Sequence, residues 1–338
     1  MNLSTYDLSE CKDQLLESVF GKGFSPYEKA CKYVKGADSR ESIIKIEENW
    51  PQEWIYFLKK LSIKNPLSAK LAESWARQTR GAGKQEVMYN IPDEGSYPWE
   101  TKTYWKKERT EQALLQLASR NRQQLIWAGA PDVIGISGGN ILLFLFICQH
   151  IWDVWIRDNR STHQERILYL PIINESVQTM GIMNASEEWA KKPKEGEYST
   201  IRLHLIKVLG QHFYNELTND LAMSYPGKNG FSLKIDDIDQ DDFLERLLNF
   251  SVEYGDFYEA PHTSKSKGEK RQKYYIAPIL CPAHKIPYKH TKEPEYIKPQ
   301  KLYEWLEPIL EKHKVKNTIK QNIETPFFQF SLPFEEGE

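Results

Sequence analysis

Two glycine-rich strings are the first places in this chain where residue types and spacing could serve nucleotide chemistry. The first, RGAGKQE, covers residues 80–86. A phosphate-binding P-loop follows a strand, begins with glycine, and has serine or threonine after its lysine to bind Mg²⁺. Here Gln78 stands where the first glycine should be, and Gln85 follows Lys84. The string also lies between predicted helices, so we expect this chain alone to hydrolyse no ATP.

The second string, GISGGN at residues 135–140, leads directly into the apolar run ILLFLFIC. Backbone N–H groups at a helix N-terminus can bind a phosphate, and glycine lets the backbone come close to it. The residues that would lie near a nucleotide are Ser137, Gly138, Gly139 and Asn140. The alternative is a structural helix start capped by Ser137, with an inward face of Ile141, Leu145, Cys148 and Trp152. Residue chemistry favours this second interpretation.

A run of carboxylates, IDDIDQDD, has the residue types of a metal-dependent nuclease. Asp236, Asp237 and Asp239 could hold Mg²⁺ there. No lysine follows at the E-x-K spacing of a strand, and residues 239–242 also fit a helix cap and an acidic first turn. We therefore expect no metal at this run, and the nuclease remains an alternative function.

Other candidates for catalysis are weaker. Cys281, His284 and His290 have a loosely zinc-like spacing, but a fourth ligand is absent. Ser137 within GISGG lacks the preceding strand that a nucleophile elbow requires. The sequence thus offers no convincing catalytic constellation, and we expect a chain that is not an enzyme.

Basic residues gather around one polar string, SKSKGEKRQK, beside Tyr274 and Tyr275. They are Lys265, Lys267, Lys270, Arg271 and Lys273. At the tip of a hairpin, such side chains would contact DNA phosphates and provide affinity without sequence specificity. The alternative is a solvated hairpin whose lysines block association at a sheet edge. The residues alone leave both interpretations open.

Length and composition set the class of protein. The chain has 338 residues, is 40% hydrophobic and carries a net charge of -2, which allows a sizeable core and excludes a strongly basic protein overall. Four scattered cysteines suit a reducing cytoplasm. The N-terminus lacks signal-peptide features, and the apolar run at 141–148 is shorter than the roughly 20 residues of a membrane span. We expect a soluble, cytoplasmic protein.

Mostly helical patterns position these candidates. Residues 1–100 predict short helices, with Ser25 and Asn65 as caps and proline after each cap. Residues 101–186 predict a helical bundle that includes one helix over 106–127, and residues 187–199 read as a charged linker. Residues 200–316 follow the order helix, strand, helix and basic hairpin, which describes a winged-helix domain with a further C-terminal helix. Residues 317–338 read as a flexible tail. The predicted fold is mainly α with a small β component.

Three strings resemble AAA+ ATPases of the origin-recognition and initiator kind, including those of anti-phage conflict systems. SGGNILLFLFICQHIW is similar to their lid-domain helix, which begins with a Ser-Gly-Asp string, and residues 104–140 and 270–296 resemble their C-terminal half. The resemblance covers residues 65–305. It implies that residues 101–186 form a lid-like bundle before the winged helix, and that the P-loop core is absent from this chain.

The resemblance also implies a function. Such a half would bind duplex DNA weakly and in a salt-sensitive way, and it would bind a partner ATPase subunit. ATP and Mg²⁺ would be held only with that partner core, with the nucleotide near residues 137–140. The family's nucleotide-sensing arginine falls at Ile141, which cannot serve that role. We therefore predict a non-catalytic DNA-binding and partner-binding subunit, with phage defence as an implied setting and a protein-only adaptor as another alternative.

Overall fold

The computed structural model describes residues 14–35, 43–78, 85–158, 172–191, 196–225, 229–263, 268–291 and 293–323. Helices dominate this part of the chain, and a small mixed sheet of four strands lies toward its C-terminal end. The predicted fold class is confirmed: a helical bundle precedes a winged-helix-like domain.

Short helices form the N-terminal region, and two of them, α2 and α4, begin at the predicted caps. They are α1 (Gln14–Phe20), α2 (Pro26–Val34), α3 (Gln52–Lys64), α4 (Pro66–Arg77), the 3₁₀ turn η3 (Gln85–Met88) and α5 (Pro98–Thr101). Ser25 accepts a hydrogen bond from the Glu28 backbone N–H, and the Glu28 carboxylate accepts one from the Ser25 N–H. Asn65 caps α4 through its side-chain oxygen. Both caps satisfy N–H groups that a helix start leaves without a partner.

The helix α6 (Thr103–Arg120) ends earlier than the sequence predicted. Arg122 has φ +54°, in the left-handed region that terminates a helix. Residues 123–128 then run without helix past α2, where the Ile126 N–H donates to the Tyr33 hydroxyl at 2.9 Å. The apolar residues after 120 therefore line a connection between helices, which helical spacing alone could not distinguish from another helical turn.

A buried carboxylate joins α4 to α6. Glu73 and Lys70 are fully buried, and the Lys70 Nζ lies 2.9 Å from the Glu73 carboxylate. Arg77 and Arg120 approach the same carboxylate at 3.3 and 3.4 Å. Burial lowers the pKa of Lys70 to about 8. Glu73 thus compensates three cations, and its loss would leave buried positive charge without a partner.

Three helices form the bundle that follows. They are α7 (Ala130–Ile136), α8 (Ile141–Asp158) and α9 (Glu175–Lys191), the last of which extends into the predicted linker. A Cβ at Gly181 of α9 would lie 2.4 Å from the Ile151 Cα of α8, so only glycine allows this close approach. Within the described residues, no helix is long and apolar enough to cross a membrane.

The C-terminal domain follows the order helix, strand, helix, helix, strand, strand. Its elements are α10 (Ser199–Asn219), β1 (Gly230–Lys234), α11 (Ile235–Asp239), α12 (Asp242–Glu253), β2 (Phe257–Thr263), β3 (Lys270–Ile276), the 3₁₀ turn η4 (Pro278–Leu280), β4 (Glu295–Tyr296) and α13 (Pro299–Ile323). The strands lie in the order β2-β3-β1-β4. Pro261 lies in β2, at an edge, where a residue without N–H is tolerated. The strand β4 pairs in parallel with β1 and was not predicted.

Aromatic packing and one ion pair hold this domain together. Phe231, Phe257 and Tyr274 contact one another on the inner face of the sheet, with ring centroids 5.2 to 6.2 Å apart. Behind them, Arg202 of α10 donates to the Asp256 carboxylate at 2.9 Å, and both side chains are fully buried. The core of the domain therefore lies on one side of the sheet and leaves the other side as an outer face.

Asp132, near the start of α7, connects three parts of the chain. Its buried carboxylate accepts hydrogen bonds from Lys29 of α2 at 2.8 Å, from the Tyr288 hydroxyl at 3.0 Å and from the Ala128 N–H at 3.2 Å. Burial and the Asp132 charge raise the pKa of Tyr288, which keeps its hydroxyl a donor. A Cβ at Gly135 would lie 2.5 Å from the Tyr288 ring, so glycine leaves room for it.

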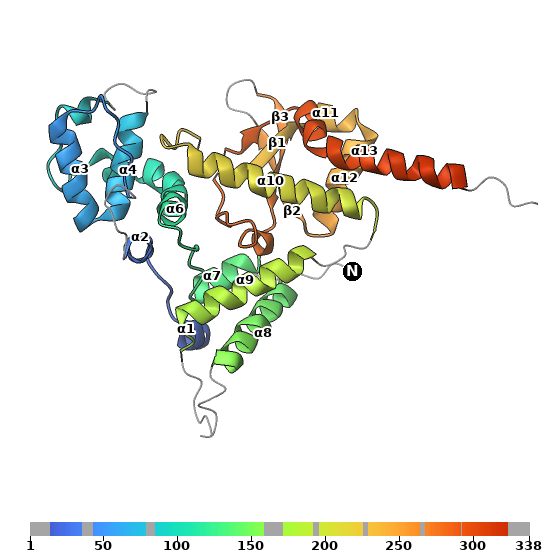
Figure 1. Ribbon diagram of the computed structural model, residues 1–338, viewed down its shortest axis with the longest axis horizontal. Coiled ribbons are helices and arrows are strands. Elements are labelled where there is room, and N and C mark those ends of the chain that lie inside the picture. Colours follow the sequence, from blue (N-terminus) through green and yellow to red (C-terminus); the bar gives the residue numbers. More distant parts are fainter. Residues whose placement is uncertain are drawn as a thin grey trace, which may run out of the picture.

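Two glutamines of α6 hold the end of α10. The side-chain amides of Gln112 and Gln116 donate to the backbone carbonyls of Leu217 and Asp220 at 2.7 to 3.4 Å. Carbonyls at a helix C-terminus have no partner within the helix, so these amides satisfy them. Figure 1 shows the result: α3 and α4 lie to one side, α7 to α9 below, and the sheet with α10 to α13 on the other side.

Candidate nucleic-acid interface

The predicted basic residues surround the hairpin of β2 and β3. Lys265 and Lys267 lie outside the described residues. Lys270 is exposed at the start of β3, and Lys273, three residues further along the same strand, is half-buried. Pairing places Lys270 opposite Thr263 and Lys273 between Ala260 and Ser232. The hairpin thus places Lys270 at the start of β3 and Lys273 near the middle of that strand.

Arg271, between those lysines, is a structural residue. Its side chain is 5% exposed. Its Nε donates to the Ser232 Oγ at 3.0 Å, and one Nη donates to the carbonyls of Ser232 and Ile297 at 2.7 and 3.1 Å. Glu269 lies 3.6 Å away, and the guanidinium is 4.8 Å from the Tyr296 ring centroid. Because every donor group faces the fold, we omit Arg271 from the DNA-contacting set that the sequence suggested.

The outer face of the sheet carries aromatic residues beside Lys273. His290 stacks on Tyr275 with ring centroids 4.1 Å apart, and it lies 5.9 Å from Tyr258. Burial and the Lys273 charge lower the pKa of His290, which favours its neutral form. The Tyr275 ring also covers Gly230, where a Cβ would lie 2.3 Å from it. This face therefore combines flat rings with positive charge.

The helix α12 has the opposite charge. In the winged-helix order, the helix before the hairpin is the one that reads DNA in the major groove. Its exposed residues include three acids and one base: Asp242, Glu245, Glu253 and Arg246. Such a surface repels phosphates, so docking of α12 in a groove is disfavoured electrostatically.

The glycine pair at 138–139 forms the turn between α7 and α8. Ser137 is buried at the end of α7, where its Oγ donates to the Ile134 carbonyl at 2.7 Å. Gly138 and Gly139 have φ of +59° and +76°, which favour glycine. Asn140 then caps α8, because its Oδ1 accepts from the N–H groups of residues 142 and 143. The structural helix start was the favoured interpretation, but its cap is Asn140, and the prediction of Ser137 was wrong.

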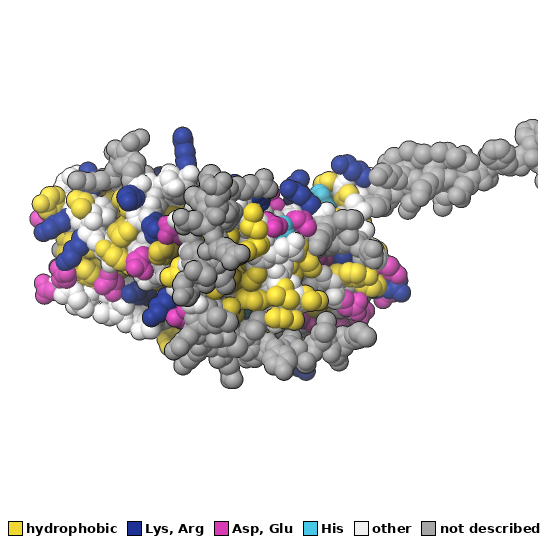
Figure 2. All heavy atoms as spheres, turned by 90° about the horizontal axis from the view of Figure 1, so that it is seen from below, with side chains coloured by type: hydrophobic (Ala, Val, Ile, Leu, Met, Phe, Trp, Pro, Cys, Tyr) yellow, Lys and Arg dark blue, Asp and Glu magenta, His cyan; other side chains and the backbone are white. Residues whose placement is uncertain are grey.

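The inward face predicted for α8 was also wrong. Ile147, Ile151 and Trp155 are the buried residues of this helix. Its outward stripe consists of Ile141, Leu142, Leu145 and Trp152, which are 40 to 61% exposed. Figure 2 shows hydrophobic side chains gathered on the face seen from below, where α8 lies. A helix with apolar residues on all sides gives no periodic signal of direction.

The carboxylate and cysteine clusters do not assemble a metal site. Among the described residues, no three His, Cys, Asp or Glu side chains converge as metal ligands. Asp236, Asp237 and Asp239 lie along the short helix α11. Cys281 is buried with its thiol near the Ile276 carbonyl, and burial raises its pKa. The nuclease hypothesis therefore gains no support from this part of the chain.

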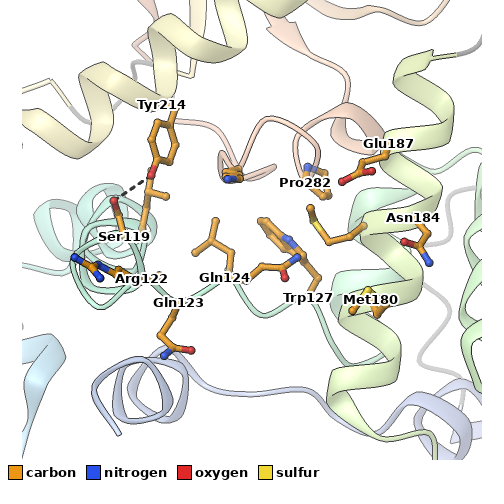
Figure 3. A pocket seen from close by; sticks show the side chains of 15 residues that line it. Ser119, Arg122, Gln123, Gln124, Trp127, Met180, Asn184, Glu187, Tyr214 and Pro282 are labelled. Atoms are coloured by element: carbon orange, nitrogen blue, oxygen red, sulfur yellow. Dashed lines mark hydrogen bonds between the residues drawn. The ribbon is translucent and has the colours of Figure 1, made fainter. Parts of the chain in front are cut away.

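A pocket of about 410 Å³ lies where α6, α9 and α10 approach the turn after η4. Figure 3 shows Trp127 pointing into it and Arg122 pointing away from its centre. The Tyr214 and Ser119 hydroxyls are hydrogen-bonded at 3.0 Å along one wall. Its lining mixes apolar side chains with the carboxylate Glu187 and the cations Arg122 and Lys285, and we assign it no chemistry.

The fold and the lysine-bearing hairpin define a winged-helix-like protein with a preceding helical bundle. A family model described as ORC-CDC6-like matches residues 3–294, a wider range than the strings that carry the resemblance. The chain belongs to the ORC-CDC6-like family. Nothing matches it among curated proteins or among solved structures.

Sequence reasoning missed the tyrosines of the outer face. In β2, FYEAPHT, buried Phe257 is followed by exposed Tyr258, which a strict alternation could have revealed. Tyr296 had no such signal, because β4 has only two residues.

Replacing Arg271 by alanine should destabilise the C-terminal domain by about 3 kcal/mol, because a buried, fully hydrogen-bonded charge is lost. Thermal unfolding followed by circular dichroism measures the change. The matched control, Lys270→Ala, removes a neighbouring exposed cation and should leave the midpoint within about one degree. Equal midpoints for both variants would contradict the structural role.

Proposed function

We propose that this chain is a non-catalytic, DNA-binding and partner-binding member of the ORC-CDC6-like family. In this role it would act as the lid and winged-helix half of an origin-recognition-like ATPase. The hairpin of β2 and β3 carries the proposal, since it presents Lys270 at the start of β3 and Lys273 three residues further along the strand. Lys265 and Lys267 precede them in the sequence between the two strands.

Charge supports contact through the hairpin and not through a recognition helix. The lysines can neutralise phosphates of any sequence, whereas α12 would meet them with Asp242, Glu245 and Glu253. Binding through a few phosphate contacts is weak at physiological salt and falls steeply as salt rises. The proposal is therefore weak, salt-sensitive binding to duplex DNA without sequence preference.

Reversing charge in the hairpin should weaken duplex binding by about tenfold or more. In Lys270→Glu with Lys273→Glu, two phosphate contacts are lost, so the dependence of log affinity on log salt should fall by about two. Fluorescence anisotropy with a labelled duplex, titrated at low and high salt, measures both quantities.

The matched control is Lys59→Glu with Lys60→Glu on α3, which changes the net charge equally at two exposed positions far along the chain. It should bind the duplex much as the unaltered chain does. No duplex binding at low salt by the unaltered chain, or equal losses in both variants, would refute hairpin-mediated binding.

The outward stripe of α8 supports a protein partner. Ile141, Leu142, Leu145 and Trp152 form a contiguous exposed apolar surface on one helix, which is typical of an interaction site. We propose a P-loop ATPase core as the partner. It would bring ATP and Mg²⁺ toward the turn at residues 137–140, beside the start of the stripe.

Polar substitution of the stripe should abolish binding to that partner. Leu142→Ser with Leu145→Ser should remove capture of a purified P-loop ATPase encoded beside this chain, because the apolar contact is lost. Ile63→Ser with Tyr56→Ser alters two exposed apolar residues of α3 as a control. Unchanged capture by the α8 variant would exclude the stripe as the interface.

Phage defence is the biological setting that we propose, and it rests on the resemblance of the quoted strings. Deleting the gene for this chain from its native locus should raise phage plaque counts on the host. Equal counts with and without the gene, across several unrelated phages, would exclude this setting.

A further inference from the structure

Two exposed tyrosines lie on the outer face of the sheet, one at each edge. Tyr258 of β2 is 54% exposed and Tyr296 of β4 is 44% exposed. The strand register places Tyr296 beside Ser232, Ser232 beside Lys273, and Lys273 beside Ala260. Between the tyrosines, Ala260 and Lys273 are half-buried, and Ser232 is fully buried beneath the Arg271 side chain.

Both tyrosine rings are held in place from within the fold. His290 lies against Tyr258, with ring centroids 5.9 Å apart and an interplanar angle of 31°. The Arg271 guanidinium lies 4.8 Å from the Tyr296 ring centroid, and the Tyr296 hydroxyl donates to Glu293 at 2.8 Å. Rings that are already ordered lose little conformational entropy when a flat ligand stacks on them.

Cations and carboxylates are equal in number around these rings, but most of the carboxylates are engaged. The cations are Lys234, Arg271, Lys273 and Lys298, and the carboxylates are Asp237, Asp241, Glu269 and Glu293. Glu269 is paired with Lys234 at 2.9 Å, Glu293 accepts from the Tyr296 hydroxyl, and Asp241 accepts from the Tyr303 hydroxyl. A hollow of about 650 Å³ adjoins the Tyr296 ring and is lined by Lys234 and Lys298. The surface thus presents flat rings and positive charge in one polar setting.

We infer that this outer face binds a short stretch of single-stranded DNA. Bases would stack on Tyr258 and Tyr296, and the intervening phosphates would lie against Lys273 and Lys298. Alternating aromatic rings and cations are the features with which proteins hold single strands without sequence readout. The inference rests on the proposed DNA-binding function, and it names a second form of DNA for the outer face of the sheet, which shares Lys273 with the hairpin site.

The geometry favours a single strand over a duplex. The tyrosines are three strand spacings and two residues apart, which corresponds to about 16 Å. A strand stacked at about 3.4 Å per nucleotide crosses that distance in about five nucleotides. Stacking on a tyrosine ring requires an unpaired base, whereas a duplex keeps its bases paired and offers the surface only phosphates.

The experiment compares tyrosine and lysine variants of the full chain by fluorescence anisotropy with labelled oligothymidine. Tyr258→Leu should weaken binding to the single strand about tenfold, because the leucine side chain cannot stack with a base. Tyr258→Phe should restore most of the affinity, since the ring is kept. Tyr296→Phe should likewise bind as the unaltered chain does, although its hydrogen bond to Glu293 is lost.

Tyr56→Leu, at a 72% exposed tyrosine of α3, is the matched control and should bind oligothymidine normally. Tyr258 lies in an edge strand and its side chain is 54% exposed, so its replacement should not unfold the domain, and circular dichroism checks this. Equal affinity of Tyr258→Leu and the unaltered chain for oligothymidine would overturn the inference, and so would duplex binding without single-strand binding. Single-strand binding that needs Tyr258, without duplex binding, would support the inference and refute only the hairpin proposal.

Discussion

The buried carboxylate of Asp132 is the interaction on which the arrangement of this molecule depends. An ionised carboxylate away from water is tolerated only when its oxygens are fully engaged. Here the partners come from α2, from the segment before α7 and from Tyr288, beyond the sheet hairpin. One charge therefore ties the N-terminal helices, the helical bundle and the C-terminal domain together.

With the domain held in this way, its charges separate by face. The net charge of -2 is the sum over surfaces of different charge. They include an acidic α12, a lysine-bearing hairpin and an outer sheet face with tyrosines and lysines. The helix α8, which carries the apolar stripe, lies on a different part of the molecule, below the sheet in Figure 1. The surfaces proposed for nucleic acid and for a protein partner therefore do not overlap.

Capping rules and residue patterns predicted the features of the fold that depend on residues close together in the sequence. The caps Ser25 and Asn65, and the order of the C-terminal elements, follow from residues within a few positions of each other. Three other features of the fold could not be predicted from such neighbouring residues. The direction of α8 depends on α9 beyond it, the burial of Arg271 depends on a carbonyl 26 residues later, and β4 is too short for any pattern. The hairpin lysines were predictable as a set, but which of them reach solvent was decided by the strand register and by partners distant in sequence.

The amides of Gln112 and Gln116 have a mechanical consequence. Helix ends are where unwinding begins, yet the last carbonyls of α10 are held by side chains of α6 one helical turn apart. The two helices are joined without a hinge at that point. A torque applied to α6 would therefore turn α10 with it, and the sheet that packs on α10 would follow as part of the same lever.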